Sequence, residues 1–166
     1  MDRDELRERQ GPLKERYRAE PTAAVVTLRA DGSLAGSDVS CSVQTGRALV
    51  EAGLHPATGG SGVLACSGDM LLQALVACAG VTLRSVATNR GIEVTGTLHA
   101  EGDLDFRGTL GVDRSAPVGF RSIRLSFELE SDASAEDLES LIATTERYCV
   151  VFQTLAHSPQ LSIAVR

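Results

Sequence analysis

The chain has 166 residues, of which 43% are hydrophobic and 23% are charged, so it is long enough for one globular domain with a buried core. Its formal net charge of −6 argues against nucleic acid as a partner, because binding phosphates needs a basic face. The longest uncharged apolar run, Met70 to Leu83, is too short to cross a bilayer, and the charged N-terminus does not resemble a signal peptide. We therefore expect a cytoplasmic protein with no nucleic-acid or membrane partner.

Four cysteines, Cys41, Cys66, Cys78 and Cys149, are expected to be reduced in that compartment. No two of them have the spacing of a zinc-binding pair, and the histidines are scattered, so no metal site is predicted. The sequence also has no phosphate loop, dinucleotide fingerprint or nucleophile elbow, so no cofactor is predicted. The thiols are therefore either buried small hydrophobes or reactive groups.

The first 20 residues are dense in charge and predict a helical extension, broken near Gly11-Pro12, ahead of a single domain at 21–166. The β-branched run at 22–29 predicts a strand. A hairpin turn at Asp31-Gly32 and a partner strand at 34–44 are expected to follow.

A glycine-rich stretch, Gly46 to Gly68, predicts a long loop, and such loops are often functional. The next segment, 69–89, predicts a helix with Asp69 at its start, where a carboxylate can cap free amides, and Gly91 at its end. This helix is apolar or small on every face between Met70 and Val81. We therefore expect it to be buried between sheets or in a dimer interface.

The C-terminal half predicts three strands, a helix and a last strand, the strands near 92–101, 104–112, 120–130 and 160–165. The helix begins at a capping box, Ser134 and Asp137, and its apolar face runs through Cys149 and Phe152. The element order, ββ-α-βββ-α-β, predicts an α+β fold.

Two of the cysteines, Cys78 and Cys149, lie in the two main predicted helices. Spacing alone favours core positions for both, since free cysteine is among the most buried residue types. Cys78 also lies too deep in its helix for the amides at the helix start to activate it. A reactive thiol there would need a neighbouring cation, for which we expect an arginine.

Two segments resemble motifs of the OsmC/Ohr family, which comprises osmotically inducible protein C and the organic hydroperoxide resistance proteins. HPATGGSGVLACSGDMLLQALVACAGVTL (55–83) is similar to the central loop and helix of that family. TERYCVVFQTL (145–155) is similar to its second cysteine motif. The separation of Cys78 from Cys149 and the element order over 22–166 also agree with the family pattern.

The resemblance implies a fold with two antiparallel-rich sheets around two long central helices, in an intertwined homodimer. It also implies thiol peroxidase chemistry without a cofactor. Cys78 would attack an organic hydroperoxide and become a sulfenic acid, and Cys149 would condense with it to a disulfide. A small dithiol or a protein thiol would then reduce that disulfide.

The sequence departs from the family pattern at several positions. Gly68 replaces a glutamate that helps to hold the activating arginine in the hydroperoxidase branch, and Asp69 follows one residue later. Val150 stands where proline is usual, and Phe152 stands where a small polar residue is usual, which could narrow access to Cys149. Supporting site residues are therefore expected among Asp69, His55, Arg18, Arg29 and Arg47.

Two functions follow from these observations. The first is a peroxidase for organic hydroperoxides in oxidative-stress defence. The alternative is a non-catalytic dimer of the same fold that binds a small apolar ligand or acts in the stress response. Retention of both cysteines favours the enzyme, whereas Gly68 and Val150 favour the alternative. The reactivity of the Cys78 thiol distinguishes the two.

Overall fold

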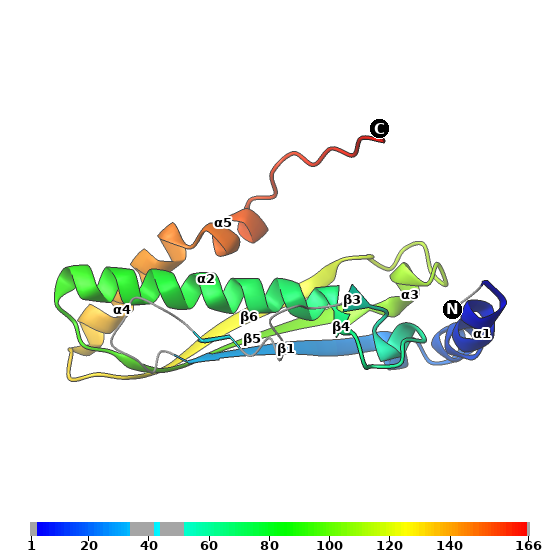
Figure 1. Cartoon of the computed structure of the whole chain (residues 1–166), viewed down its shortest axis with the longest axis horizontal. Helices are drawn as coiled ribbons and strands as arrows, with labels where there is room; N and C mark the ends of the chain where they lie inside the picture. Colours follow the sequence, from blue (N-terminus) through cyan, green and yellow to red (C-terminus); the bar gives the residue numbers. More distant parts are fainter. Residues whose placement is uncertain (1–2, 34–41, 44–51, 166) are drawn as a thin grey trace.

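The computed structural model describes residues 3–33, 42–43 and 52–165 (Figure 1). Its main feature is a four-stranded antiparallel sheet with one face covered by a long helix. The strand order is β2-β1-β5-β6, with bounds Ser42–Val43, Val25–Ser33, Thr95–Asp105 and Phe120–Glu130. The covering helix is α2, Ser67–Arg90. The fold is therefore α+β, as the element order predicts.

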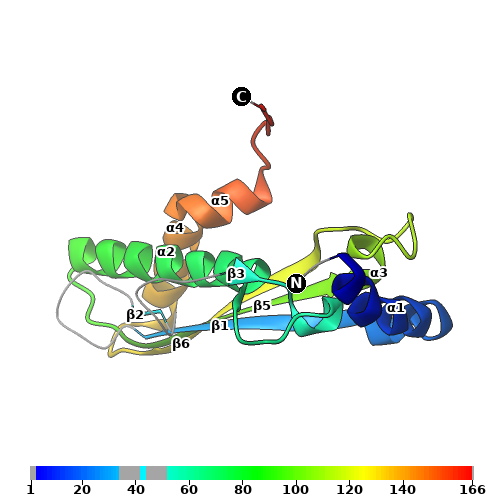
Figure 2. The same ribbon diagram turned by 45° about the vertical axis from the view of Figure 1, so that its right-hand side comes forward.

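The other helices lie along α2 or beyond one end of the sheet. α4 (Ala135–Tyr148) and α5 (Val150–Ala156) pack against α2 itself. α1 (Arg3–Ala19), η1 (Pro21–Ala24) and α3 (Phe106–Thr109) lie beyond the far end of the sheet, with η2 (Pro56–Thr58) against α1 (Figures 1 and 2). The short strands β3 (Ala52–Gly53) and β4 (Ala65–Cys66) pair in parallel just before α2 begins.

The helix α2 supplies the centre of the core. One face is buried against β1 and β5, through Leu72, Leu75, Val76, Ala79, Gly80, Leu83 and Ala87. The opposite face keeps Met70, Leu71 and Val81 between 37% and 42% exposed. Within one chain only part of the surface of α2 is covered, so the predicted burial of this helix on every side is not reached in the single chain.

The ends of α2 follow the sequence signals closely. Asp69 lies in the first turn, and Gly91 closes the helix at a φ of +68°, with its amide donating to the carbonyls of Ala87 and Thr88. By length and apolar composition alone α2 could span a membrane. Its packing on the sheet accounts for the same composition.

The two faces of the sheet differ in polarity. On β5, Leu98, Ala100 and Leu104 point toward α2 and are buried. The outer face carries the Arg124 guanidinium, which lies 2.6 Å from Asp103 and 3.4 Å from Glu101. One face thus holds the core while the other is solvated, as is usual for an antiparallel sheet.

The N-terminal predictions need two corrections. α1 is continuous through Gly11-Pro12, and Tyr17 near its end is 2% exposed and donates a 2.6 Å hydrogen bond to the carbonyl of Ala57. β1 runs straight through Asp31-Gly32 instead of turning, because these residues pair with β5. The expected partner strand is present in part, since Ser42–Val43 pair with the end of β1.

The expected strands at 92–101 and 104–112 are one strand, β5, followed by the short helix α3. Gly102 does not interrupt β5, because the ring of Phe120 packs where its Cβ would lie. Asp105 ends the strand and caps α3, accepting a 3.1 Å hydrogen bond from the Arg107 amide. The hydrogen bond between the Asp105 carboxylate and this amide thus fixes where β5 ends and α3 begins, which the apolar periodicity of the sequence does not show.

The C-terminal predictions also need two corrections. The expected single helix is two helices, α4 and α5, which meet at Cys149. The capping prediction is confirmed, since the Asp137 amide donates to the Ser134 hydroxyl at 3.1 Å. The segment 160–165 joins neither of the sheets that the structure describes. It leaves α5 on the side of α2 that faces away from the sheet (Figures 1 and 2).

Candidate functional site

The structure brings Cys78 and Cys149 together. Cys78 is half-buried in the middle of α2, and Cys149 is 1% exposed at the junction of α4 and α5. Their side chains are hydrogen-bonded, and both are free thiols. Two residues that lie far apart in the sequence are therefore positioned to react with each other.

The backbone at Cys149 explains how its sulfur is aimed. The residue is extended, with φ −72° and ψ 106°, and ends α4 while starting α5. Its Sγ atom accepts a 3.5 Å hydrogen bond from the Phe152 amide and so acts as the N-cap of α5. The break in the helix turns the thiol inward toward α2.

The environment of Cys149 raises the pKa of its thiol to about 11. Burial is the main cause, because it disfavours the thiolate. The hydrogen bond and the charge of Cys78 act in the same direction, whereas the amides of Phe152 and Val151 lower the pKa. Cys149 therefore keeps its proton at neutral pH and is the natural donor in the pair.

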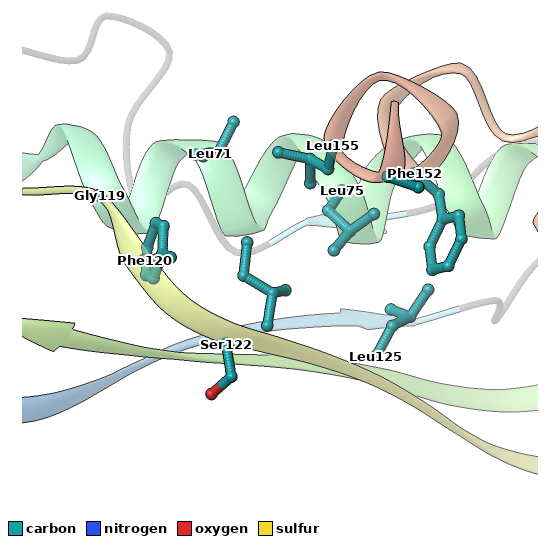
Figure 3. A pocket seen from close by; sticks show the side chains of 10 residues that line it. Leu71, Leu75, Gly119, Phe120, Ser122, Leu125, Phe152 and Leu155 are labelled. Carbon is teal, nitrogen blue, oxygen red and sulfur yellow. The ribbon is translucent and has the colours of Figure 1, made fainter. Parts of the chain in front are cut away.

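One cavity is lined by Cys149, and a second cavity shares two of its lining residues. The thiol pocket, of about 170 Å³, is lined by Ala79, Leu125, Phe127, Ile142, Thr145, Glu146, Cys149 and Phe152. The apolar groove, of about 520 Å³, is lined by Leu71, Leu75, Gly119, Phe120, Ser122, Ile123, Leu125, Phe152, Leu155 and Ala156 (Figure 3). Phe152 and Leu125 line both, and in Figure 3 the Phe152 ring points from α5 toward Leu125 of β6. Phe152 thus stands between the groove and the pocket beside Cys149.

His55 and Asp69 meet at the start of α2, away from the cysteines. The His55 Nδ1 atom accepts a 3.0 Å hydrogen bond from the Ala57 amide, and its ring stacks on Phe106 with centroids 5.0 Å apart. Burial lowers the pKa of His55, and the Asp69 carboxylate partly opposes this. Burial likewise raises the pKa of Asp69, and His55 partly opposes that. The two groups are electrostatically coupled, and His55 caps η2 and packs against Phe106.

Within one chain this pair lies far from the thiols. Asp69 precedes Cys78 by nine positions on the same helix, which is about 13 Å along the axis at 1.5 Å per residue. The structure therefore does not bring His55 or Asp69 to the cysteine pair of the same chain.

The candidate arginines are placed differently. Arg18 is exposed near the end of α1, beyond the end of the sheet. Arg29 lies on β1 opposite Glu101 in the register, and Arg47 lies outside the described residues, as does Cys41. Arg84, on α2 itself, donates a 2.8 Å hydrogen bond to the carbonyl of Val94 and so anchors the chain after the helix.

The described part of the glycine-rich stretch before α2 is closely packed and contains the short elements β3, η2 and β4. At Gly60 a Cβ would come within 1.7 Å of the Leu54 carbonyl oxygen, so only glycine fits this close approach. Among the described residues, no group of three or more His, Cys, Asp or Glu side chains could hold a metal ion.

Sequence reasoning missed the apolar groove, apart from Phe152. Its lining comes from α2, β6 and α5 and the approach to β6, so its members are distant in the sequence. Their alternation on 120–130 and their helical spacing at Leu71 and Leu75 mark them only as apolar faces. Nothing in the sequence shows that these faces enclose a space.

Comparison with known proteins adds two findings. A solved structure, that of an OsmC-like hydroperoxide resistance protein from Jannaschia sp. CCS1, matches the fold with a TM-score of 0.57 at 15% sequence identity. The match covers 86% of this chain and 94% of that one. A search of curated proteins gave no match. The family model for OsmC-like proteins matches residues 60–164, and this chain therefore belongs to the OsmC-like protein family.

Proposed function

We propose that the protein is a thiol-dependent peroxidase that reduces organic hydroperoxides to alcohols in defence against oxidative stress. The observation that carries this proposal is the hydrogen-bonded pair of free thiols, Cys78 and Cys149. The similarity in fold to a hydroperoxide resistance protein supports it. Membership of the OsmC-like family supports it further.

The proposed reaction has two steps at the protein. The Cys78 thiolate attacks the distal oxygen of the hydroperoxide, the O–O bond breaks, and the alkoxide takes a proton and leaves as the alcohol. Cys78 is then a sulfenic acid. The Cys149 sulfur attacks it, a disulfide forms, and the hydroxyl leaves as water. A dithiol then reduces the disulfide and is itself oxidised to a disulfide.

The different surroundings of the two thiols suit these roles. A thiol that keeps its proton is a poor nucleophile, so Cys149 is unsuited to the first attack. Two of the causes that raise the pKa of Cys149 are the hydrogen bond and the charge of Cys78. Conversion of Cys78 to a neutral sulfenic acid removes that charge. The resolving thiol thus becomes easier to ionise only after the peroxide has reacted.

The cavities favour an apolar substrate. The apolar groove is lined almost entirely by hydrocarbon and leads to Phe152, the last side chain before the thiol pocket. A fatty or aryl hydroperoxide can bury its hydrocarbon part there, with a gain of about 0.8 kcal/mol for each buried methylene group. Hydrogen peroxide gains nothing from such a surface.

The proposal includes a homodimer, a thiol reductant and a cytoplasmic location. Exposed apolar side chains on α2, Met70, Leu71 and Val81, offer a surface that a second copy would cover. The reductant is a dithiol or a protein thiol, because the disulfide must be reopened for each turnover. Three described cysteines are free, which suits a reducing compartment.

Asp69 and His55 enter the proposal only through a second copy. Asp69 and His55 lie too far from Cys78 along α2 to assist it within one chain. Arg18, Arg29 and Arg47 remain candidates for the cation that would stabilise the Cys78 thiolate. A second chain would have to bring Asp69, His55 or Arg18 to the thiol pair.

The test is peroxide consumption by the pre-reduced protein with cumene hydroperoxide, hydrogen peroxide and a dithiol reductant. Cys78→Ser should abolish turnover, a loss on the order of 10³-fold or more, as expected for removal of a nucleophile. Cys149→Ser should leave a single reduction of peroxide and trap the sulfenic acid. Cys66→Ser is the matched control and should leave the rate unchanged. Equal rates for wild type and Cys78→Ser would overturn the proposal.

The apolar groove also favours the alternative, a non-catalytic dimer that binds a small apolar molecule. Phe152 separates the groove from the thiol pocket, so a ligand could occupy the groove without reaching either sulfur. Binding of a fluorescent fatty acid to the Cys78→Ser protein, together with no peroxide turnover by wild type, would favour this alternative. Turnover that depends on Cys78 would exclude it.

A further inference from the structure

Among the described residues that line the thiol pocket, Glu146 is the one with a formal charge at neutral pH. It lines this pocket together with Cys149, and the other lining residues are apolar or carry a hydroxyl group. Glu146 is exposed, whereas Cys149 is 1% exposed, so Glu146 stands on the solvent side of the pocket and Cys149 on its inner wall. The pocket therefore joins a buried thiol to water past a carboxylate.

The backbone places Glu146 and Cys149 on the same side of α4. The Cys149 amide donates a 2.8 Å hydrogen bond to the Thr145 carbonyl, which continues the last turn of α4 up to Cys149. Residues three apart on such a turn are neighbours, with Cβ atoms about 5–6 Å apart. Beyond the break, the Gln153 side chain donates a 2.9 Å hydrogen bond to the Glu146 carbonyl. The turn that carries Glu146 is thus held to α5 as well as to α4.

The second step of the proposed reaction needs a proton acceptor at this place. Burial raises the pKa of the Cys149 thiol to about 11, so very little of it is thiolate at neutral pH. The sulfur must lose its proton when it attacks, and the hydroxyl that leaves the Cys78 sulfenic acid must gain one. A group that moves this proton has to line the space beside Cys149.

Of the described residues that line the two cavities, Glu146 is the one suited to this task. The described lining of the apolar groove contains no titratable side chain. In the thiol pocket, the buried Thr145 hydroxyl already donates its proton to the Leu141 carbonyl at 2.9 Å. Arg147, next in the sequence, lies over the Tyr148 ring at 5.5 Å from the centroid and does not line the thiol pocket. The described lining therefore holds no cation that would neutralise Glu146.

We propose that Glu146 is the general acid–base catalyst of disulfide formation between Cys78 and Cys149. This proposal rests on the proposed peroxidase and deepens it by adding a residue to the second step. The Glu146 carboxylate takes the proton of the Cys149 thiol while the S–S bond forms and the S–O bond of the sulfenic acid breaks. The hydroxyl then leaves with that proton as water. The carboxylate is restored, the Cys149 sulfur is oxidised, the Cys78 sulfur is reduced, and no other reactant is needed.

The first test separates the two steps in a single turnover with one equivalent of cumene hydroperoxide. The remaining peroxide reports the first step, and dimedone labelling read by mass spectrometry reports the lifetime of the sulfenic acid. Glu146→Gln should consume peroxide within about twofold of the wild-type rate and should slow loss of the sulfenic acid by about 10²-fold. Glu139→Gln, exposed on α4 and outside both linings, is the control. Loss of the sulfenic acid at the wild-type rate in Glu146→Gln would overturn the proposal.

The pH dependence distinguishes proton transfer from a structural role. Without the carboxylate only the thiolate of Cys149 can react, so the rate of disulfide formation by Glu146→Gln should rise about tenfold for each pH unit between about pH 6 and pH 9. The wild-type rate should change much less, because the base acts on the thiol itself. Added formate should restore part of the rate of Glu146→Gln and leave wild type unchanged. The same pH slope in both proteins would contradict the proposed role.

A second assay uses no peroxide. Dithiobis(nitrobenzoate) forms a mixed disulfide at Cys78, and attack by Cys149 then releases a coloured thiolate. In a Cys41→Ser/Cys66→Ser background, Glu146→Gln should slow this second release by about 10²-fold, whereas Glu139→Gln should not. Slowed release in a protein that consumes no peroxide would retain the role of Glu146 and remove the peroxidase. Peroxide turnover together with an unchanged second release would do the reverse.

Discussion

The start and the middle of α2 both carry titratable side chains, but the surroundings of these side chains differ. At the start, His55 and Asp69 lie beside α3, and His55 caps η2 and stacks on Phe106. In the middle, Cys78 lies beside Cys149, which lines the thiol pocket in largely apolar surroundings. The polar groups at the start mainly hold the chain in place, whereas the thiols have each other as partners. A titratable side chain near a conspicuous loop is therefore weaker evidence of a site than two reactive atoms in contact beside a cavity.

The largest effect on stability is expected in the region beside the helix start. Asp105 is 2% exposed, and its carboxylate lies 2.6 Å from the Arg107 guanidinium. Asp105→Ala removes the buried carboxylate that caps α3 and binds Arg107, and should lower the free energy of unfolding by about 1–3 kcal/mol in urea titrations. Asp103→Ala, on the solvated outer face of the same strand, should cost clearly less. Equal losses would show that burial does not distinguish the two pairs.

The stability difference between wild type and Asp105→Ala should also depend on pH. The hydrogen bonds from Arg107 hold the pKa of Asp105 below its ordinary value. Because the folded state favours the charged form, its contribution is complete above the unfolded pKa of about 3.9 and is lost as the pH falls below it. Wild type should therefore lose more stability than Asp105→Ala as the pH falls from about 5 to about 3. Parallel losses would contradict this.

The next effect tests the barrier between the two cavities. Phe152→Ala should join the apolar groove to the thiol pocket, because Phe152 lines both. The ratio of the turnover with cumene hydroperoxide to that with hydrogen peroxide should rise about tenfold, as expected for a change in pocket volume. Leu155→Ala, which lines the groove alone, should leave access to Cys149 unchanged. A ratio that does not move in Phe152→Ala would mean that the substrate reaches the thiols by another route.

A smaller effect tests the coupling of the thiols. Cys78→Ala removes the hydrogen bond and the charge that help to raise the pKa of Cys149, while burial and the two amides remain. The pKa of Cys149 should therefore fall below about 11 in a titration of thiolate absorbance. Cys66→Ala should leave it unchanged. A pKa that stays at the wild-type value would show that burial alone sets it.

The smallest effect is expected at the polar start of α2. His55→Ala removes the cap of η2 and the stack on Phe106, and should lower the free energy of unfolding by about 1–2 kcal/mol. Peroxide turnover should stay within about twofold of wild type, because a contact far from the reacting atoms contributes little to the transition state. His157→Ala, at an exposed position, is the control. Loss of turnover in His55→Ala would instead bring the two regions together through a second copy.

The helices and the family could be predicted from the sequence, and the reasons are local. The apolar run, Asp69 and Gly91 define α2 nearly to the residue. The Ser134 cap sets the start of α4 correctly. The break at Cys149 could not be predicted, because the apolar spacing runs through it without a change of period.

Most errors arise where long-range pairing overrides a local signal. Asp31-Gly32 has the composition of a hairpin turn but pairs with β5 along an unbroken strand. The cysteine pair was predicted by resemblance, whereas spacing alone favoured two core residues. The structure explains how both views arise, since Cys149 is buried in the core and hydrogen-bonded to Cys78.

The position of Cys149 also links chemistry to architecture. Its sulfur holds the Phe152 amide at the start of a seven-residue helix, and that helix carries both the aromatic barrier and the tail of the chain. A sulfur that changes its bonding partner changes what the first turn of α5 rests on. Oxidation of this sulfur would therefore act directly on the hydrogen bond that caps the first turn of α5.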